Sequence, residues 1–438
     1  MSTIYALSTS AAKAAIAVIR ISGPQARLAL AALTPKRVKP RQAHLVKLRH
    51  QGQLLDEALA FYMPGPASFT GEDSVELHVH GGKAVIRSVL AALSSHKGLR
   101  YAEPGEFSKR AFRAGKLDLT QAEALADLIH AETEQQRRAA VSQAAGALAK
   151  RYDGWREQLI QGRAMLEAVI DFGEDNEIDS TVVEQVQQRV RQLQEAIRNH
   201  LEAGVRGERL KHGITVALFG PPNAGKSSLL NLLCRREVSI VSDEAGTTRD
   251  VVETMLDIGG YPVILCDTAG LRDAQGFVEQ QGVRLANMRV EEADLRLCVV
   301  PAGEAMDPLT QALVTPETML VVNKVDLRSD ARQGHHLSCT THAGVDAFLA
   351  ALTGRLQALT SDEHGQGLAL GTTARHREQC ERCLEHLDIF LRYDTHGFDF
   401  VLAAEELRYA GDCLGRVLGR IDVEELLSVI FRDFCIGK

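Results

Sequence analysis

A glycine-rich segment near the middle of the chain restricts its fold more than any other feature. Residues 220–227 read Gly-Pro-Pro-Asn-Ala-Gly-Lys-Ser, the pattern G-x-x-x-x-G-K-S, between an apolar run at 214–219 and a helix-like stretch at 228–234. Glycines let backbone N–H groups turn toward phosphate oxygens where a helix begins. We therefore predict a phosphate-binding loop, with Lys226 neutralising the terminal phosphate and the Ser227 hydroxyl binding Mg²⁺. The predicted contacts are Asn223, Ala224, Gly225, Lys226, Ser227 and Ser228.

Two further motifs each follow an apolar run of strand length. Asp267-Thr268-Ala269-Gly270 follows residues 263–266, which predicts that Asp267 supports Mg²⁺ from the outer shell while Gly270 follows the γ-phosphate. Asn323-Lys324-Val325-Asp326 follows residues 319–322. A carboxylate there can accept the N1 and N2 hydrogens of guanine, a donor pair that adenine lacks. Because an unpaired buried carboxylate is costly, this motif favours GTP over ATP.

Three less specific predictions complete the nucleotide site. Thr248, in the segment 246–250, is expected to close over Mg²⁺ and the γ-phosphate. Ser338, Cys339 and Thr340 are expected to direct a backbone N–H toward the guanine oxygen. Leu271 occupies the position where many nucleotide hydrolases carry the glutamine that positions water, so an acidic residue is needed instead. The residues alone leave Asp273 and Glu279 as alternatives.

Length and composition indicate a soluble, modular protein. At roughly 150 residues per domain, 438 residues suggest about three domains, and 45% apolar with 24% charged residues is typical of globular proteins. A formal net charge of −7 excludes nucleic-acid binding by overall charge. The eight cysteines are scattered, and no signal peptide or long apolar span is evident, which predicts a reduced, cytoplasmic protein.

Changes in residue pattern along the chain predict an insertion. Residues 1–118 mix short strand-like runs with turns and predict an α+β domain. Residues 119–210 and 363–438 have helical spacing, whereas 211–362 combine buried strands with helices and predict a mostly parallel α/β domain. The expected architecture is therefore a phosphate-loop α/β domain inserted into an all-α domain.

These motifs, together with the terminal Phe434-Cys435-Ile436-Gly437-Lys438, resemble the MnmE (TrmE) family of tRNA modification GTPases over the whole chain. The resemblance implies a tetrahydrofolate-binding N-terminal domain that dimerises, a split helical domain and an inserted G domain. It further implies carboxymethylaminomethyl or aminomethyl addition at carbon 5 of the wobble uridine of certain tRNAs. A homodimer is expected to work with MnmG (GidA) in a heterotetramer. Because this chain has no G-x-G-x-x-G fingerprint, the FAD is expected on that partner.

The resemblance also assigns residues around the γ-phosphate. It implies potassium-dependent dimerisation of the G domains, with K⁺ in place of an arginine finger and Asn223, Ser242, Glu244 and Thr247 as its ligands. It selects Glu279 as the catalytic glutamate. The loop expected along the nucleotide comprises Ser242, Asp243, Glu244, Ala245, Gly246, Thr247 and Thr248. Two departures from the family pattern are Gln280-Gln281 after the glutamate and Cys339 in place of alanine.

A second site is implied in the N-terminal domain. Arg20, Glu76, Lys116 and Lys438 match positions that contact 5-formyltetrahydrofolate or methylenetetrahydrofolate. A carboxylate suits the N–H edge of the pterin, and cations suit the glutamate tail. Taken singly, each of these residues is an ordinary surface charge. Cys435 is either a reactive thiol near the one-carbon carrier or an anchor of the terminal segment.

Some patterns have simpler interpretations. Cys380 and Cys383 lie in a helical stretch without a second pair, so packing is favoured over a metal site. His78 and His80 lack an evident third ligand for zinc. The alternative function is that of a GTP-switched ribosome-assembly or binding factor without one-carbon chemistry. Binding of formyl-tetrahydrofolate separates the two functions.

Overall fold

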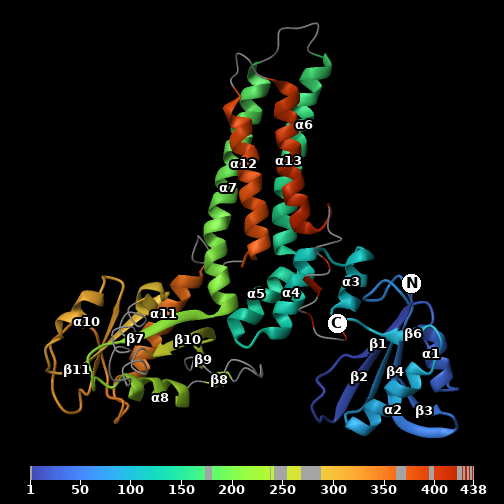
Figure 1. Cartoon of the computed structure of the whole chain (residues 1–438), viewed down its shortest axis with the longest axis horizontal. Helices are drawn as coiled ribbons and strands as arrows, with labels where there is room; N and C mark the ends of the chain where they lie inside the picture. Colours follow the sequence, from blue (N-terminus) through green and yellow to red (C-terminus); the bar gives the residue numbers. More distant parts are fainter. Residues whose placement is uncertain are drawn as a thin grey trace, which may run out of the picture. The chain divides into compact units, whose positions relative to one another are not determined.

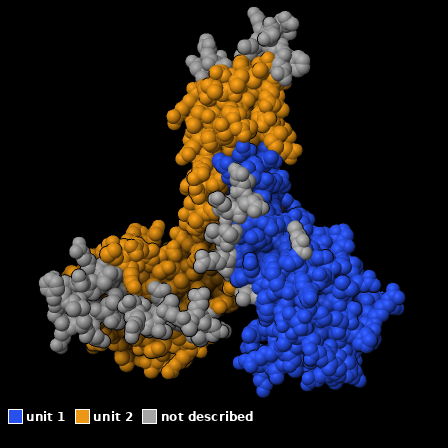
Figure 2. All heavy atoms as spheres, turned by 45° about the vertical axis from the view of Figure 1, so that its right-hand side comes forward, with its two compact units in different colours: residues 1–126, 149–156, 411–438 blue, residues 127–148, 157–410 orange. Residues whose placement is uncertain are grey.

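The computed structural model describes residues 2–172, 180–236, 238–240, 254–267, 288–361, 371–393 and 399–421, with positions 427, 430, 431, 434 and 437. Internal contacts divide the chain into two compact units (Figure 2). Unit 1 comprises residues 1–126, 149–156 and 411–438, and unit 2 comprises 127–148 and 157–410. Among the described residues, no helix combines the length and apolarity needed to cross a membrane. The domain boundaries drawn from the sequence remain predictions.

Unit 1 is built on a six-stranded sheet with the order β3-β4-β5-β2-β1-β6 (Figure 1). Neighbouring strands are antiparallel except β1 and β6. The strands are β1 (Thr3–Leu7), β2 (Ile16–Ser22), β3 (His44–His50), β4 (Gln53–Met63), β5 (Ser74–His80) and β6 (Leu99–Tyr101). Helices α1 (Ala26–Leu33) and α2 (Lys83–Ser94) pack against the sheet.

The two faces of this sheet differ because successive side chains on a strand point in opposite directions. Ile19, Ile21 and Leu77 are fully buried in one core with apolar residues of α1 and α2. Ile4 and Ala6 of β1 instead pack with Phe107 of α3 (Glu106–Arg113) in a second cluster. Arg20 and Ser22 pair in register with Ala6 and Ile4. Helix α3 therefore lies over the face that carries Arg20.

The segment that follows α13 completes unit 1. Leu427, Phe431 and Phe434 are buried against Leu119 and Ala122 of α4 (Leu119–His130). The Ser8 hydroxyl donates to the carbonyl of Gly437 over 2.9 Å. A Cβ at Gly437, whose φ is +97°, would lie 2.2 Å from the carbonyl oxygen of Leu7. Residues near the C-terminus are thus seated against the end of the first strand.

Long helices make up the α-helical part of unit 2. They are α5 (Glu134–Ala144), α6 (Ala147–Phe172), α7 (Ser180–His212), α12 (Ala374–Arg392) and α13 (Phe400–Leu418), of which α6 and α13 also contribute residues to unit 1. Helix α12 runs beside α7 (Figure 1). Cys380 and Cys383 are fully buried on the same face of α12 as Leu387 and Phe390. Their spacing of three and four residues is that of a packed helical stripe.

The other part of unit 2 is a seven-stranded sheet with the order β13-β12-β11-β7-β10-β9-β8. Its strands are β7 (Ile214–Phe219), β8 (Val238–Ile240), β9 (Thr254–Ile258), β10 (Tyr261–Asp267), β11 (Leu295–Pro301), β12 (Met319–Asn323) and β13 (His335–His336). All pairs are parallel except those that β9 forms with β8 and β10. The mostly parallel sheet predicted from the apolar runs is confirmed.

Both faces of this sheet are covered, which explains why its central strands are largely apolar. Leu229 and Leu233 of α8 (Lys226–Arg236) share one core with Phe348 and Leu352 of α11 (Val345–Thr360). A second core on other strand residues includes Leu313 of α10 (Pro308–Leu313) at its margin. The buried strands end at one edge of the sheet, where the predicted nucleotide motifs begin.

Candidate functional site

The predicted phosphate loop connects β7 to α8 at this edge. Two of its glycines have positive φ, +145° at Gly220 and +95° at Gly225. A Cβ at Gly220 would lie 2.0 Å from the carbonyl oxygen of Val299, and one at Gly225 would lie 2.2 Å from Nδ2 of Asn323. Real Cβ atoms do not approach this closely, so the loop needs glycine for both its turn and its packing.

Lys226 is the first residue of α8 and is only 8% exposed. Its ammonium donates to the carbonyls of Gly220 and Pro221 over 2.9 and 2.8 Å, so it lies inside the curve of the loop. Ser227 and Ser228 are exposed in the first turn. The Leu229 N–H donates to the Gly225 carbonyl, so helical hydrogen bonding begins there. The N–H groups that precede the first intrahelical bond are the ones that bind anions at a helix N-terminus.

Asn323 joins three of the predicted loops through one buried amide. Its Nδ2 donates to the Ala224 carbonyl over 2.9 Å, and its Oδ1 accepts from the Cys339 N–H over 3.2 Å. The side chain is almost inaccessible, because the residue is 2% exposed. The next residue, Lys324, has a φ of +65° and donates from Nζ to the Asn223 carbonyl over 2.7 Å. The phosphate loop and the predicted guanine loops are therefore physically connected.

The remaining guanine-loop residues border this connection. Asp326 has an exposed side chain, and the Val325 N–H donates to the Leu337 carbonyl. Ser338 is fully buried, and its hydroxyl accepts from the N–H groups of Thr340 and Thr341. Burial raises the pKa of the Cys339 thiol to about 11. It outweighs a hydrogen bond with Asn323 that lowers the pKa, and the Asp326 charge adds a smaller increase. This thiol stays protonated at neutral pH.

Several predicted nucleotide contacts lie outside the described residues. They are Ser242, Asp243, Glu244, Ala245, Gly246, Thr247, Thr248, Thr268, Ala269, Gly270 and the predicted catalytic Glu279. Asp267 is the last residue of β10, and its backbone pairs in register with Leu218 of β7, next to the phosphate loop. The structure thus brings together the segments 223–228, 323–326 and 338–340 with the backbone of Asp267. The roles of these residues in binding GTP, Mg²⁺ and K⁺ remain predictions.

In unit 1, two of the predicted folate contacts form an ion pair across neighbouring strands. Arg20 and Glu76 face each other in the register of β2 and β5. Nε and Nη2 of Arg20 donate to Oε1 of Glu76 over 3.0 and 2.9 Å. The Arg20 guanidinium carbon lies 5.6 Å from the ring centre of Phe69 and 5.7 Å from that of Phe107. The pair is about three-quarters buried, with two aromatic rings near the guanidinium.

The neighbouring histidines have different surroundings. His78 Nε2 lies 3.6 Å from Oε2 of Glu76, and its ring centre is 4.9 Å from that of Phe61. The exposed His80 instead contacts Asp56 through Nδ1 over 2.7 Å. Among the described residues, no group of three or more His, Cys, Asp or Glu side chains is arranged to hold a metal ion.

The other predicted folate contacts are placed less completely. Lys116 is exposed, and its Cε lies 3.8 Å from where a Cβ on Gly71 would be. Lys438 and Cys435 fall outside the described residues, although Gly437 between them is held by Ser8. The Ser8 N–H donates to the Val18 carbonyl, two residues before Arg20. Ser8 therefore links Gly437 to the strand that carries Arg20.

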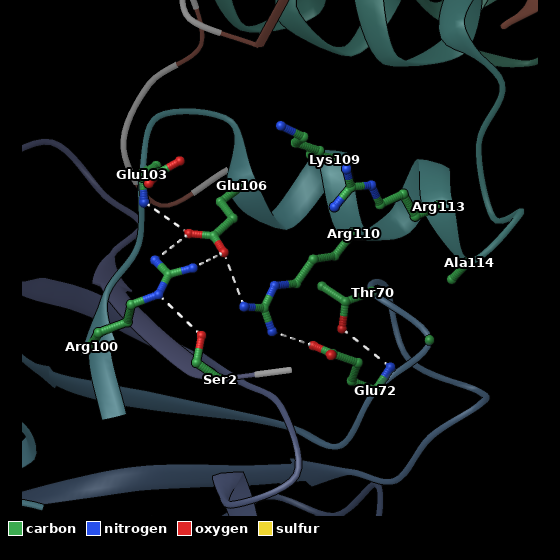
Figure 3. A pocket seen from close by; sticks show the side chains of 11 residues that line it. Ser2, Thr70, Glu72, Arg100, Glu103, Glu106, Lys109, Arg110, Arg113 and Ala114 are labelled. Atoms are coloured by element: carbon green, nitrogen blue, oxygen red, sulfur yellow. Dashed lines mark hydrogen bonds and ion pairs between the residues drawn. The ribbon is translucent and has the colours of Figure 1, made fainter. Parts of the chain in front are cut away.

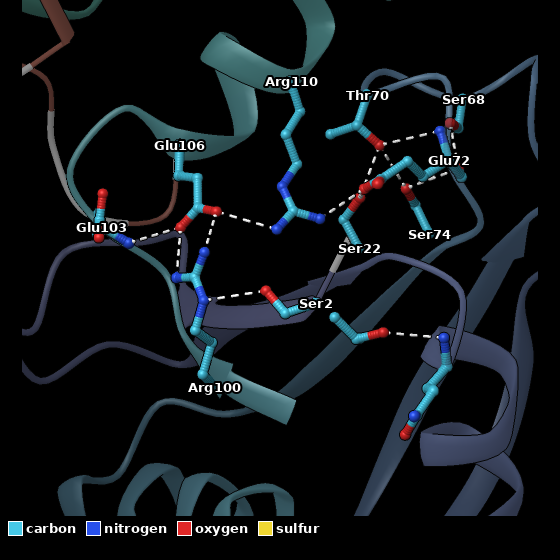
Figure 4. A network of polar contacts seen from close by, with 12 residues as sticks. Ser2, Ser22, Ser68, Thr70, Glu72, Ser74, Arg100, Glu103, Glu106 and Arg110 are labelled. Carbon is cyan, nitrogen blue, oxygen red and sulfur yellow. Dashed lines mark hydrogen bonds and ion pairs between the residues drawn. The ribbon is translucent and has the colours of Figure 1, made fainter. Parts of the chain in front are cut away.

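A cavity of about 380 Å³ in unit 1 was not anticipated from the sequence (Figure 3). Loop 70–72, the stretch 100–106 and α3 line it, with Ser2 at one side. Arg110 of α3 donates to Glu72 over 2.8 Å and to Glu106 over 2.9 Å, and Arg100 also donates to Glu106 (Figure 4). The only sequence signal was the i, i+4 spacing of Glu106 and Arg110.

Opposing effects act on the Glu106 carboxyl. Burial would raise its pKa, but hydrogen bonds from Arg100, the Glu103 N–H and Arg110 outweigh burial and lower it. Glu106 is therefore ionised at neutral pH and keeps both arginines engaged. The Ser22 hydroxyl extends the same network, because it contacts Thr70 and donates to Glu72 over 2.9 Å.

Comparisons with known proteins agree with this arrangement. The family model "GTP-binding protein TrmE N-terminus" matches residues 3–116, and "MnmE helical domain" matches 119–435. The tRNA modification GTPase MnmE of Parvibaculum lavamentivorans is 52% identical over 443 residues, which cover 100% of both chains. The human mitochondrial 5-taurinomethyluridine-tRNA synthase subunit GTPB3 is 47% identical, covering 100% of this chain and 93% of its own. With a phosphate loop joined to its guanine loops and this similarity throughout, the chain belongs to the MnmE family of tRNA modification GTPases.

Proposed function

We propose that this protein hydrolyses GTP at the edge of the seven-stranded sheet and thereby serves modification of the wobble uridine of certain tRNAs. The observation that carries the nucleotide part is the buried Asn323 amide, which holds the phosphate loop at Ala224 and the guanine loop at Cys339. This contact fixes the distance between a site for phosphates and a site for a base. The named activity of the bacterial relative supports the tRNA part.

Each residue of the nucleotide site has a defined task in this proposal. Lys226, inside the loop curve, places its ammonium against the β- and γ-phosphates, and Asp326 accepts the N1 and N2 hydrogens of guanine. Glu279 orients the attacking water and accepts its proton, directly or through a second water. Ser227 and Thr248 would hold Mg²⁺, and Asn223, Ser242, Glu244 and Thr247 would hold K⁺. When bound, these cations offset the negative charge that develops on the phosphates.

We further propose that Arg20, Glu76, Lys116 and Lys438 bind a tetrahydrofolate that donates the one-carbon unit. The aromatic rings of Phe69 and Phe107 beside the Arg20–Glu76 pair suit a flat pterin, and the carboxylate suits its N–H edge. Cys435, near the seated Gly437, is proposed either as a thiol at this carrier or as an anchor. The protein acts as a homodimer with potassium-dependent pairing of its G domains, and MnmG supplies the FAD.

The base assignment is tested by Asp326→Asn. An amide can accept one hydrogen bond and donate another, which matches the edge of xanthine, where a carbonyl replaces the amino group of guanine. We expect hydrolysis of GTP to fall and that of xanthosine triphosphate to rise in the variant. Loss of both activities, or an unchanged preference for GTP, would contradict the role of Asp326.

The remaining parts are tested separately on the full-length protein. Replacing potassium by sodium should sharply slow GTP turnover, and equal rates would remove the potassium ligands from the proposal. Glu279→Ala should keep nucleotide affinity and lose hydrolysis, whereas weaker affinity would mean a structural role. Equilibrium binding of 5-formyltetrahydrofolate that disappears in Glu76→Ala supports one-carbon chemistry. Absence of binding to the wild type would favour a GTP-switched assembly factor.

A further inference from the structure

Positive charge is concentrated in the stretch that leads from α1 through β3, the strand at one edge of the sheet of unit 1. Six of the fifty Lys and Arg residues lie at positions 36–50, which contain no Asp or Glu, although the formal net charge of the chain is −7. We call residues 36–50 the basic segment. Its six cations, all exposed, are Lys36, Arg37, Lys39, Arg41, Lys47 and Arg49.

Carboxylates do not neutralise these cations. Within the part of the chain that the structure describes, none of the six forms an ion pair with an Asp or Glu. Glu57, which faces Lys47 in the register of β3 and β4, is no exception. The side chains of Lys36, Arg41 and Arg49 donate instead to backbone carbonyls. A carbonyl orients a cation without cancelling its charge, so the basic segment keeps its charge for an anionic partner.

The strand part of the basic segment shares a face of the sheet with Arg20. Val46 is buried in the core with residues of α1 and α2, so its neighbours Leu45 and Lys47 point to the opposite face. The register of β3, β4, β5 and β2 aligns Leu45 with Val18, two residues before Arg20. Neighbouring strands lie about 4.8 Å apart, so three strand intervals place β3 roughly 14 Å from β2.

The loop part of the basic segment is joined to the loop that carries Phe69. The Arg41 guanidinium donates to the carbonyl of Ala67, two residues before Phe69. The Phe69 ring lies 5.6 Å from the guanidinium carbon of Arg20. A polyanion bound along the basic segment would therefore pass beside the Arg20–Glu76 pair, where the proposed one-carbon donor binds.

We propose that the basic segment binds the phosphate backbone of tRNA and holds this substrate next to the folate site. The inference rests on the tRNA part of the proposed function and adds where this chain contacts the RNA. Because a chain with a net negative charge repels a polyanion overall, it needs a local positive surface of this kind. Phosphate contacts position a nucleic acid without reading its sequence, so the basic segment serves different tRNAs alike.

The test compares the tRNA affinity of the full-length wild type with that of the triple variant Arg37→Gln, Lys39→Gln and Lys47→Gln. These three side chains form no hydrogen bond or ion pair with other residues that the structure describes, so their replacement should preserve the fold. We expect affinity at about 0.1 M salt to fall about tenfold or more for every tRNA tried. The slope of log affinity against log salt should become shallower by about 2–3, because each phosphate contact contributes roughly 0.7–0.9.

The matched control replaces three cations elsewhere on unit 1, by Lys83→Gln, Arg87→Gln and Lys97→Gln. These residues are exposed on α2 and in the turn after it, and their loss changes the net charge by the same amount. The control should bind tRNA as the wild type does. An equal loss of affinity in both triple variants would show that overall charge matters rather than the basic segment, and would overturn the proposal.

Other outcomes separate this inference from the function on which it rests. Unchanged tRNA affinity in the variant of the basic segment, or no tRNA binding by the wild type, would overturn the surface and leave GTP hydrolysis and wobble modification standing. Intact wobble modification in cells without this protein would refute the tRNA function itself. If the variant kept its tRNA affinity but lost binding to phosphatidylserine vesicles, the basic segment would be a membrane site. Loss of tRNA affinity together with a monomeric mass in light scattering would make it a dimer contact, and the proposal would be wrong.

Discussion

The two candidate sites of this protein are constructed in contrasting ways. The nucleotide loops are held mainly by backbone carbonyls, two glycines and the Asn323 amide. The site in unit 1, on the face of the sheet that carries Arg20, is held by charged side chains that neutralise one another. A site built from backbone groups requires that no side-chain atom stands at a few glycine positions. A charge-built site, one held by ion pairs, depends on partners that water, salt ions and protons can replace.

The largest expected effect follows from filling a glycine position in the nucleotide loops. Gly225→Ala places a Cβ 2.2 Å from Asn323 Nδ2 in a backbone conformation that disfavours side chains. The amide must move, and its contacts with Ala224 and Cys339 are lost together. We expect GTP affinity to fall at least about 100-fold, the equivalent of roughly 3 kcal/mol, in titrations with a fluorescent nucleotide.

Gly354→Ala on α11 is the control, since nothing lies within 4 Å of its Cβ position. There, alanine is expected to stabilise the helix by about 1 kcal/mol or less. Unchanged nucleotide affinity in Gly225→Ala would contradict the contrast between the nucleotide site and the site in unit 1, because it would mean that the nucleotide loops can rearrange around an added atom.

A smaller loss is expected from the charge-built site. Arg110→Met leaves Glu72 and Glu106 without their shared partner, and the Arg110 side chain is only 9% exposed. Removing one member of a buried pair typically costs about 3–5 kcal/mol, which we reduce to about 2–4 because Glu72 is partly solvated. Hydrogen exchange of amides in residues 99–116 should accelerate accordingly.

Arg87→Met, an exposed change on α2, should leave this exchange unaltered. If the amides of residues 99–116 in Arg110→Met exchange at the wild-type rate, the ion pairs of Arg110 with Glu72 and Glu106 are incidental surface contacts. The two sites would then differ less than their contacts indicate.

Lowering the pH should destabilise the site in unit 1 before the nucleotide site, without any mutation. The folded-state pKa of Glu106 lies below its usual value of 4.5, so its stabilisation is fully present above about pH 4.5 and is lost as pH falls through the lowered pKa. The Cys339 thiol, with a pKa of about 11, does not titrate in this range. Exchange rates corrected for intrinsic pH dependence should rise in residues 99–116 before they rise in 220–229. The reverse order would contradict the comparison.

The smallest effect is expected where charges pair in full solvent. Glu134 on α5 has a pKa of about 2 because of hydrogen bonds from Arg137 and Arg138, yet all three side chains are exposed. Glu134→Gln should therefore leave the melting temperature almost unchanged, and added salt should remove any difference. A large drop would show that charge pairing alone, without burial, accounts for the behaviour of the N-terminal site.

The same contrast explains how far the sequence predicted the structure. The phosphate loop, its strand and its helix were predictable because a contiguous motif carries the turn chemistry, and buried parallel strands read as continuous apolar runs. The link from Asn323 to Ala224 and Cys339 was not predictable. Asn323 and Ala224 are 99 positions apart, and the amide that joins them could occur on any helix or loop. A motif reports the residue types at a site but not the contacts that hold neighbouring loops together.

The cavity of unit 1 was harder still to predict. Its lining comes from Ser2, loop 70–72, β6, the turn after β6 and α3, and its charged residues are of ordinary types. Arg20 and Glu76 were recognised only through family resemblance, although their cross-strand register is what makes them a pair. Such sites depend on strand register and helix placement, which local sequence patterns specify weakly.

The seating of Leu427, Phe431, Phe434 and Gly437 against the N-terminal unit has a consequence for biosynthesis. The ribosome makes these residues about 300 positions after β6, which at typical elongation rates is a delay of roughly 15–60 seconds. During that interval the nascent N-terminal unit exposes the apolar surface of α4 that these residues later cover. Leu119 and Ala122 of α4 therefore gain this apolar cover only after the intervening residues have been synthesised.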